Sequence, residues 1–262
     1  MAKKVLNAKR SQAPRRAKAP ARRYGWKPDI PDHRDFRFAR RAAALPEVVS
    51  HRAKLLAALA IQDQGELGSC TAHAAAAAMA FLHRGLDLSR LKLYYDERVI
   101  DGTVDQDSGA YIRDSVKVLN QTGAAAESYW PYVVAKFTKK PPPRANASAA
   151  KHKISKYMRV APSDYRSCLA AGFPFIIGFS VYESFEGPTT AQTGRVFYPK
   201  KSEAQLGGHA VCVIGYASRW GELHYEVRNS WGADWGDAGH FWIPARYLEN
   251  LDLADDAWTV RA

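Results

Sequence analysis

Apolar residues recur at helical spacing through the first half of the chain. The pattern predicts helices from Cys70 to about Arg84, at residues 89–101 and at residues 108–123. The first of these helices is rich in alanine and begins directly after a turn-like, glycine-containing stretch. Because alanine side chains are small, we expect this helix to pack closely inside a core.

The second half of the chain changes to the alternating pattern of β-strands, with many β-branched and aromatic residues. Strands are predicted at residues 153–160, 174–182, 208–217, 223–231 and 240–247, with a short helix at 165–172 and a Pro-rich surface loop at 139–153. Helices followed by strands are typical of an α+β fold in two lobes. We expect a helical lobe at roughly 57–150 and a β-rich lobe at roughly 151–262, with the site in the cleft between them.

The N-terminal residues differ from the rest in charge. Residues 1–23 hold nine Lys and Arg and no acidic residue, so of the formal net charge of +12 only about +3 belongs to the remainder. Such a segment is too polar to pack, and we expect a disordered arm that contacts polyanions without specificity. Residues 24–44 are expected to lie extended on the surface of the folded domain at 45–262. Their aromatic residues are Tyr24, Trp26, Phe36 and Phe38.

The remaining composition, 47% hydrophobic and 24% charged, is ordinary for a globular protein. The sequence lacks an apolar run of about 18 residues, so no membrane span is expected. The basic start lacks the apolar segment of a secretory signal. The three cysteines are then expected to stay reduced. We expect the protein to be cytoplasmic, or released without a classical signal peptide.

Cys70 is the residue around which a site can be built. At a helix N-terminus, unsatisfied N–H groups favour the thiolate, which is the nucleophilic form. Among eight histidines, His209 stands out because two glycines lead it into an apolar strand. Asn229 can accept a histidine N–H, and Trp231 can shield that bond from water. Gln64, six residues before Cys70, can supply an oxyanion donor.

A metal site is the alternative use of the same thiol. Cys70 and His73 form C-x-x-H, which places two ligands on one helical turn. Zinc takes about four ligands, and the sequence offers no second pair at suitable spacing. No metal is therefore expected, and His73 is interpreted as a packing or surface residue.

Together these residues and their contexts resemble the papain-like cysteine peptidases. The resemblance covers roughly residues 45–262 and rests on five motifs in family order. They read LPEVVSHR, QDQGELGSC, DSGAYIRDSVKVLNQTGAAAESYWPY, GGHAVCVIGY and VRNSWGADWGDAGHFWIP. His209 follows Cys70 by 139 residues, and Asn229 follows His209 by 20. In this family the histidine and asparagine lie roughly 130 to 150 residues after the nucleophile. Asn229 follows Cys70 by 159 residues, slightly more than this range, which a loop insertion would explain.

The resemblance implies a papain-like fold, with a helical left lobe and a β-barrel-like right lobe on either side of the cleft. It implies Cys70 as nucleophile, His209 as general base and then acid, and Asn229 as the orienting residue. Gln64 and the Cys70 N–H would form the oxyanion hole. The residues carried over as substrate-binding are Gly109, Ala110, Tyr111, Gly208 and Trp231.

Two departures from the family pattern stand beside the nucleophile. Leu67 replaces a cysteine, which removes a disulfide partner, and Thr71 replaces an aromatic residue, which changes a contact in the cleft. The set resembles a prokaryotic or phage-type branch with a short N-terminal extension.

The expected function is hydrolysis of peptide bonds in a protein or peptide substrate, without a cofactor. Transglutaminase-like or amidase acyl transfer would use the same triad, and a catalytically silent relative would only bind peptides. Residues 24–44 have two interpretations. They form an autoinhibitory plug in the cleft, or they pad the back of the fold.

Overall fold

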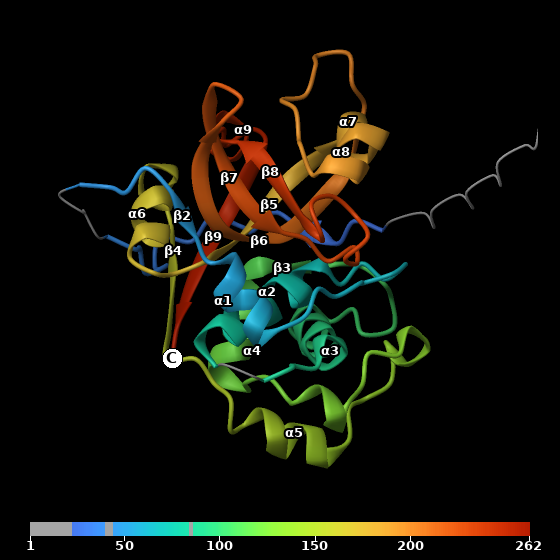
Figure 1. The fold of residues 1–262 in the computed structure, drawn as a ribbon. Coiled ribbons are helices and arrows are strands. Elements are labelled where there is room, and N and C mark those ends of the chain that lie inside the picture. Colours follow the sequence, from blue (N-terminus) through green and yellow to red (C-terminus); the bar gives the residue numbers. More distant parts are fainter. Residues whose placement is uncertain (1–22, 40–43, 84–85) are drawn as a thin grey trace, which may run out of the picture.

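A helical half and a β-rich half lie side by side in the computed structural model (Figure 1). The structure describes residues 23–39, 44–83 and 86–262. The predicted basic arm, apart from Arg23, lies outside the described residues, and so do Arg84 and Gly85. The arrangement is the α+β class that the sequence predicts. No described helix is long and apolar enough to cross a membrane.

Short helices and turns build the first half. Their bounds are α1 Arg52–Ala58, α2 Cys70–Leu82, α3 Arg90–Asp101, α4 Ile112–Gln121, η1 Glu127–Tyr129, η2 Val134–Lys136 and α5 Pro143–Ala149. Helix α3 begins where the Ser89 hydroxyl accepts a hydrogen bond from the Lys92 N–H at 3.2 Å. The Pro-rich stretch predicted as a loop contains α5, because a proline at the first helical turn loses no hydrogen bond and sets φ for a helix.

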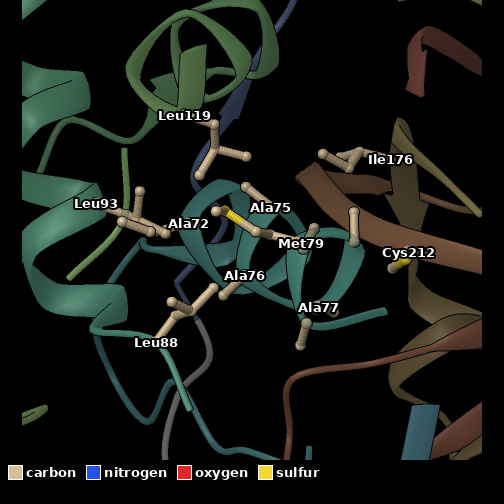
Figure 2. Packing of buried hydrophobic residues seen from close by; sticks show 14 of the residues in the cluster. Ala72, Ala75, Ala76, Ala77, Met79, Leu88, Leu93, Leu119, Ile176 and Cys212 are labelled. Atoms are coloured by element: carbon tan, nitrogen blue, oxygen red, sulfur yellow. The ribbon is translucent and has the colours of Figure 1, made fainter. Parts of the chain in front are cut away.

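Helix α2 is buried on all its sides, as its alanine content predicts. A helix with no polar face belongs in a core, and α2 packs between α3 and α4 on one side and strands of the β-rich half on the other. Figure 2 shows this packing for Ala72, Ala75, Ala76, Ala77 and Met79, with Leu88, Leu93, Leu119, Ile176 and Cys212 around them. The burial fixes the N-terminus of α2, and with it Cys70, at the junction of the two halves.

A mostly antiparallel sheet forms the second half. The bounds are β2 Val49–Ser50, β4 Lys156–Arg159, η3 Pro162–Asp164, α6 Tyr165–Ala170, β5 Phe175–Tyr182, α7 Glu183–Glu186, α8 Pro188–Thr193, β6 Gln205–Arg219, β7 Glu222–Arg228, β8 His240–Pro244, α9 Ala245–Leu248 and β9 Ala254–Arg261. The strand order is β4-β9-β5-β6-β7-β8, and β2 pairs with β6. Strand β9, which the sequence pattern did not predict, lies inside this sheet between β4 and β5.

The segment before the catalytic domain is extended, as predicted, and runs between the two halves. Strand β1 (Trp26–Lys27) pairs in parallel with β3 (Ala110–Tyr111) and also contacts β5 and β6 (Figure 1). Further along, Phe38 is 6% exposed and packs into the core, whereas Phe36 is 68% exposed. Phe36 is therefore not the apolar anchor that its type suggests.

Candidate active site

Cys70 is the first residue of α2 and is fully buried. The glycine-containing turn delivers it there, with Ser69 as the residue preceding the helix. The backbone N–H of Ala210 donates to its sulfur at 3.4 Å. Since Ala210 follows His209 on β6, this contact brings Cys70 close to the strand segment that carries His209, although the two residues lie far apart in the sequence.

His209 and Asn229 form a direct hydrogen bond. His209 Nε2 lies 2.8 Å from Asn229 Oδ1, which also accepts the Ser230 N–H at 2.9 Å. Because Oδ1 is an acceptor, Nε2 carries the proton, and Nδ1 is the nitrogen left for proton transfer. The Trp231 ring lies 5.1 Å from the imidazole at an interplanar angle of 30°. Both partners and the indole are buried, so water does not compete for the bond.

Gln64 is buried, and both ends of its side-chain amide are hydrogen-bonded. Its Oε1 accepts the Ser230 hydroxyl at 2.7 Å, which fixes the orientation of the amide. Its Nε2 donates to Leu67 O at 2.9 Å and to Arg23 O at 3.3 Å. Ser230 was not predicted as a site residue, and its position directly after Asn229 was the available signal.

An N-terminal strap, defined as residues 23–30, crosses the site. The backbone N–H of Gly25 lies close enough to the Cys70 thiol to favour the thiolate, and the Gly25 carbonyl accepts the Ala110 N–H at 2.7 Å. Tyr24 packs near His209 and Trp231, with ring centroids 6.2 and 6.3 Å away. The strap thus lies over Cys70 and the His209 side chain.

Asp107, which the sequence analysis did not single out, connects the turn before Cys70 with the segment that contains Gly109. Asp107 accepts the Gly68 N–H at 3.0 Å and the Tyr94 hydroxyl at 2.6 Å. The Gly109 N–H donates to the same hydroxyl at 3.0 Å, and its φ of +70° explains the glycine. The N–H that bonds the strap is therefore the one at Ala110, next to the expected Gly109.

The other expected substrate residues also face the strap. Lys27 lies over the Tyr111 ring at 5.2 Å and pairs with Asp101 at 2.5 Å. A Cβ at Gly208 would lie 2.7 Å from the indole of Trp26. Beyond Trp231 lies a cavity of about 470 Å³. Its lining residues are Asp63, Pro188, Ala191, Gln192, Trp231, Gly232, Ala233, Asp234 and Trp235.

With the strap in place, the pKa of Cys70 does not favour the thiolate that its position at a helix N-terminus suggests. Burial raises the pKa of Cys70 to about 11, despite backbone N–H groups of Ala210, Gly25 and Thr71 that favour the thiolate. Burial also raises the pKa of Glu97 to about 8, and this carboxyl accepts the Thr71 hydroxyl at 2.7 Å. Glu97 is then mostly protonated at neutral pH, so it opposes a thiolate only weakly.

His73 is a buried, neutral residue of α2. Its Nδ1 hydrogen-bonds Ser69 O at 2.9 Å, and burial lowers its pKa to about 3, so it is neutral. Among the described residues, no group of three or more His, Cys, Asp or Glu side chains is placed to hold a metal ion. Cys168 and Cys212 are free and buried in the core.

Comparison with known proteins agrees with this geometry. The pattern of the papain family cysteine proteases matches residues 45–260. The solved structure of xylellain, a cysteine protease from Xylella fastidiosa, superposes with a TM-score of 0.85 at 39% identity, covering 94% of this chain and 98% of that one. A peptidase C1-like protein of Acanthamoeba polyphaga mimivirus is 39% identical over 220 residues, 78% of this chain and 70% of that protein.

A more distant relative is also a peptidase by name. Peptidase 1 of Dermatophagoides pteronyssinus is 28% identical over 205 residues, and this chain spans 58% of its length. The family match covers most of the chain, and two relatives at 39% identity cover more than two thirds of it. The predicted resemblance is confirmed: the chain belongs to the papain family of cysteine proteases.

Proposed function

We propose that the chain hydrolyses peptide bonds through a thioester on Cys70. The observation that carries the proposal is the Ala210 N–H bond to the Cys70 sulfur. It joins the nucleophile to the strand that bears His209, whose ring is already oriented by Asn229. Gln64, whose amide is fixed by hydrogen bonds to Leu67 O and from the Ser230 hydroxyl, would supply an oxyanion donor.

The chemistry follows from these roles. His209 Nδ1 takes the thiol proton, and the thiolate attacks the carbonyl carbon of the substrate. The oxyanion that forms is stabilised by Gln64 Nε2 and the Cys70 N–H, two preorganised donors in a buried site. The imidazolium then protonates the leaving amine, and the C–N bond breaks to give the thioester. Water, deprotonated by His209, hydrolyses the thioester and restores the thiol. None of these steps requires a cofactor.

The test is an assay of the full chain on peptides with a fluorogenic amide. We expect hydrolysis, and we expect a thiol-directed epoxide to stop it by modifying Cys70 and neither Cys168 nor Cys212, as read by mass spectrometry. Transfer of the acyl group to an added amine in preference to water would contradict the peptidase assignment and favour the transglutaminase-like alternative. Binding of peptides without turnover or labelling would favour the silent relative.

We further propose that the strap inhibits this activity. The strap brings the backbone N–H of Gly25 close to the Cys70 thiol, and an N–H group is not an electrophile. The Arg23 carbonyl accepts the Gln64 amide proton that an oxyanion would use. A segment that occupies both positions without presenting a carbonyl carbon excludes substrate and is not itself cleaved. This supports the plug interpretation of residues 24–44 over padding.

Acidic side chains make the docking of the strap depend on pH. Asp29 of the strap lies beside the buried Asp256, and its N–H donates to Asp256 Oδ2 at 2.7 Å. Burial, together with the charges of Asp29 and Asp255, raises the pKa of Asp256 from 3.8 to about 6, although Arg159 opposes this. Trp26 Nε1 also faces Asp256. Between about pH 4 and pH 6, Asp256 therefore holds a proton while the strap is docked. It loses this proton when the strap is released.

We expect the strap to be held more tightly at pH 5 than at pH 7.5. After correction for intrinsic exchange rates, hydrogen exchange should show protection of the amides of residues 23–30 falling about tenfold over this range. Asp256→Asn, which does not titrate, is the control and should flatten the dependence. Equal protection at both pH values, or greater protection at pH 7.5, would contradict the expectation.

A further inference from the structure

His73 is a buried histidine that the proposed chemistry does not use. It lies about one turn after Cys70 on α2. Its Nδ1 is 2.9 Å from the carbonyl oxygen of Ser69, and because a carbonyl oxygen only accepts, Nδ1 carries the ring proton. The ring is neutral, so Nε2 is left as a hydrogen-bond acceptor. This nitrogen is buried and has no hydrogen-bond partner in the part of the chain that the structure describes.

Asn229 has a buried donor that also lacks a partner. Its Oδ1 accepts hydrogen bonds from His209 Nε2 and from the Ser230 N–H. A backbone N–H only donates, so the oxygen end of the amide is fixed there and Nδ2 faces the other way. Among the described residues, nothing accepts a hydrogen bond from Nδ2. A buried donor without an acceptor is costly, and the cost falls on the residue that orients His209.

Both residues line one small cavity between α2 and the sheet. Its volume is about 10 Å³, close to the least space that holds one water molecule. The lining residues are Gln62, His73, Ala74, Ala77, Ala210, Val211, Arg228, Asn229 and Ser230. A buried water needs two to four polar partners, and this cavity has polar side chains from α2 on one side and from the end of β7 on the other.

The chemistry of the lining groups selects the occupant. Asn229 Nδ2 is a donor, and Arg228, whose guanidinium donates to the carbonyl oxygens of Leu59 and Ala60, is a cation with donors only. His73 Nε2 is an acceptor. A metal ion cannot accept the amide proton and would be repelled by the guanidinium, while an anion without a proton cannot donate to Nε2. Water both accepts and donates, so it satisfies both sides.

We infer that a water molecule in this cavity accepts a hydrogen bond from Asn229 Nδ2 and donates one to His73 Nε2, which makes His73 a positioning residue for the His209–Asn229 pair. The inference rests on the proposed peptidase function and deepens it. The Asn229 amide is then held at both ends, by the Ser230 N–H and by the water. Rotation of that amide would move Oδ1 away from the imidazole, so His73 acts on His209 through Asn229.

Two substitutions in the full chain separate this role from packing. His73→Gln places an amide oxygen near the position of Nε2, whereas His73→Asn keeps a donor near Nδ1 for the Ser69 carbonyl and leaves nothing at Nε2. We expect kcat/KM to fall about tenfold in His73→Asn, the scale of one unsatisfied buried donor, and His73→Gln to recover most of this loss. The loss should be equal for peptides with different side chains, because the water does not contact the substrate.

The comparison with Asn229→Ala decides whether His73 acts through Asn229. Adding His73→Asn to Asn229→Ala should lower kcat/KM by no more than about twofold, because the group that His73 positions is already gone. A further tenfold loss in the double variant would overturn the inference. So would a milder loss in His73→Asn than in His73→Gln, since a histidine that only packs α2 needs its contact with Ser69 more than its Nε2.

The bridge itself is read without activity. A crystal structure of the full chain should show an ordered water within hydrogen-bond distance of both His73 Nε2 and Asn229 Nδ2. Its absence would overturn the inference alone, since peptide hydrolysis would continue. If the unsubstituted chain cleaves no peptide and the epoxide does not label Cys70, the proposed function fails, and the positioning role of His73 fails with it.

Discussion

Cys70→Ala is expected to abolish peptide hydrolysis, with kcat/KM reduced on the order of 10⁵-fold or more, as when the nucleophile of a triad is removed. The alanine leaves the fold of α2 intact, because its neighbours along the helix are already alanines packed in the core. What is lost is the only atom in the site that can form the thioester. Labelling by the epoxide should disappear together with turnover.

His209→Ala should be nearly as severe, because the thiol then loses the base that activates it and the leaving amine loses its acid. Asn229→Ala should cost less, roughly 10²-fold, since the histidine remains but is no longer oriented. The matched control is Cys168→Ala, which removes a buried thiol far from the site chemistry and should leave kcat/KM within about threefold. Activity retained in folded Cys70→Ala, or lost equally in Cys168→Ala, would contradict the assignment of the nucleophile.

The residues proposed for catalysis could be predicted from the sequence because each lies in a characteristic local sequence. Cys70 follows a glycine turn and opens an alanine helix, and His209 and Asn229 border apolar strands. Their meeting point could not be deduced from these contexts. It depends on the pairing of β6 with its neighbours and on the burial of α2, both of which are long-range contacts.

The elements that the sequence analysis missed are those whose character is set by distant partners. Strand β9 contains Asp255 and Asp256. These two consecutive charged residues interrupt the alternation of apolar and polar positions by which a strand is predicted. The second carboxylate is tolerated in the interior because Trp26, Asp29 and Arg159 supply its hydrogen bonds. Trp26 and Asp256 are 230 residues apart, so no local sequence pattern indicates that they form a hydrogen bond.

Asp107 was missed for a similar reason. An aspartate beside a serine and a glycine is typical of a turn, and its sequence context gives no sign of a structural role. In the fold it joins the turn before Cys70 to helix α3, by accepting hydrogen bonds from the Gly68 N–H and the Tyr94 hydroxyl. The wrong assignment of α5 to a loop has a local cause, because prolines mark a helix start as readily as a turn.

The second large effect is expected at Gly25, where one methyl group should release the strap. Gly25 lies against Gly68 and Gly109, with backbone on both sides. A Cβ on Gly25 would overlap the carbonyl oxygen of Gly68, which is backbone and cannot rotate away. Gly25 is not in the left-handed region, so the effect of alanine is steric rather than conformational. Overpacking of this kind costs about 1–3 kcal/mol, all of it in the docked state.

Gly25→Ala in the full chain should therefore raise kcat/KM about 10- to 100-fold, since 1.4 kcal/mol is tenfold in an equilibrium. Water that reaches Cys70 should also remove part of the burial that raises its pKa, so iodoacetamide should modify Cys70 faster at pH 7. The control is Ile30→Ala, at a strap side chain that is 75% exposed, and it should change neither rate. Circular dichroism establishes that each variant is folded. If folded Gly25→Ala matches the unmodified chain in both rates, the strap does not restrain the enzyme. The Gly25 N–H over the sulfur would then be a contact without consequence for activity.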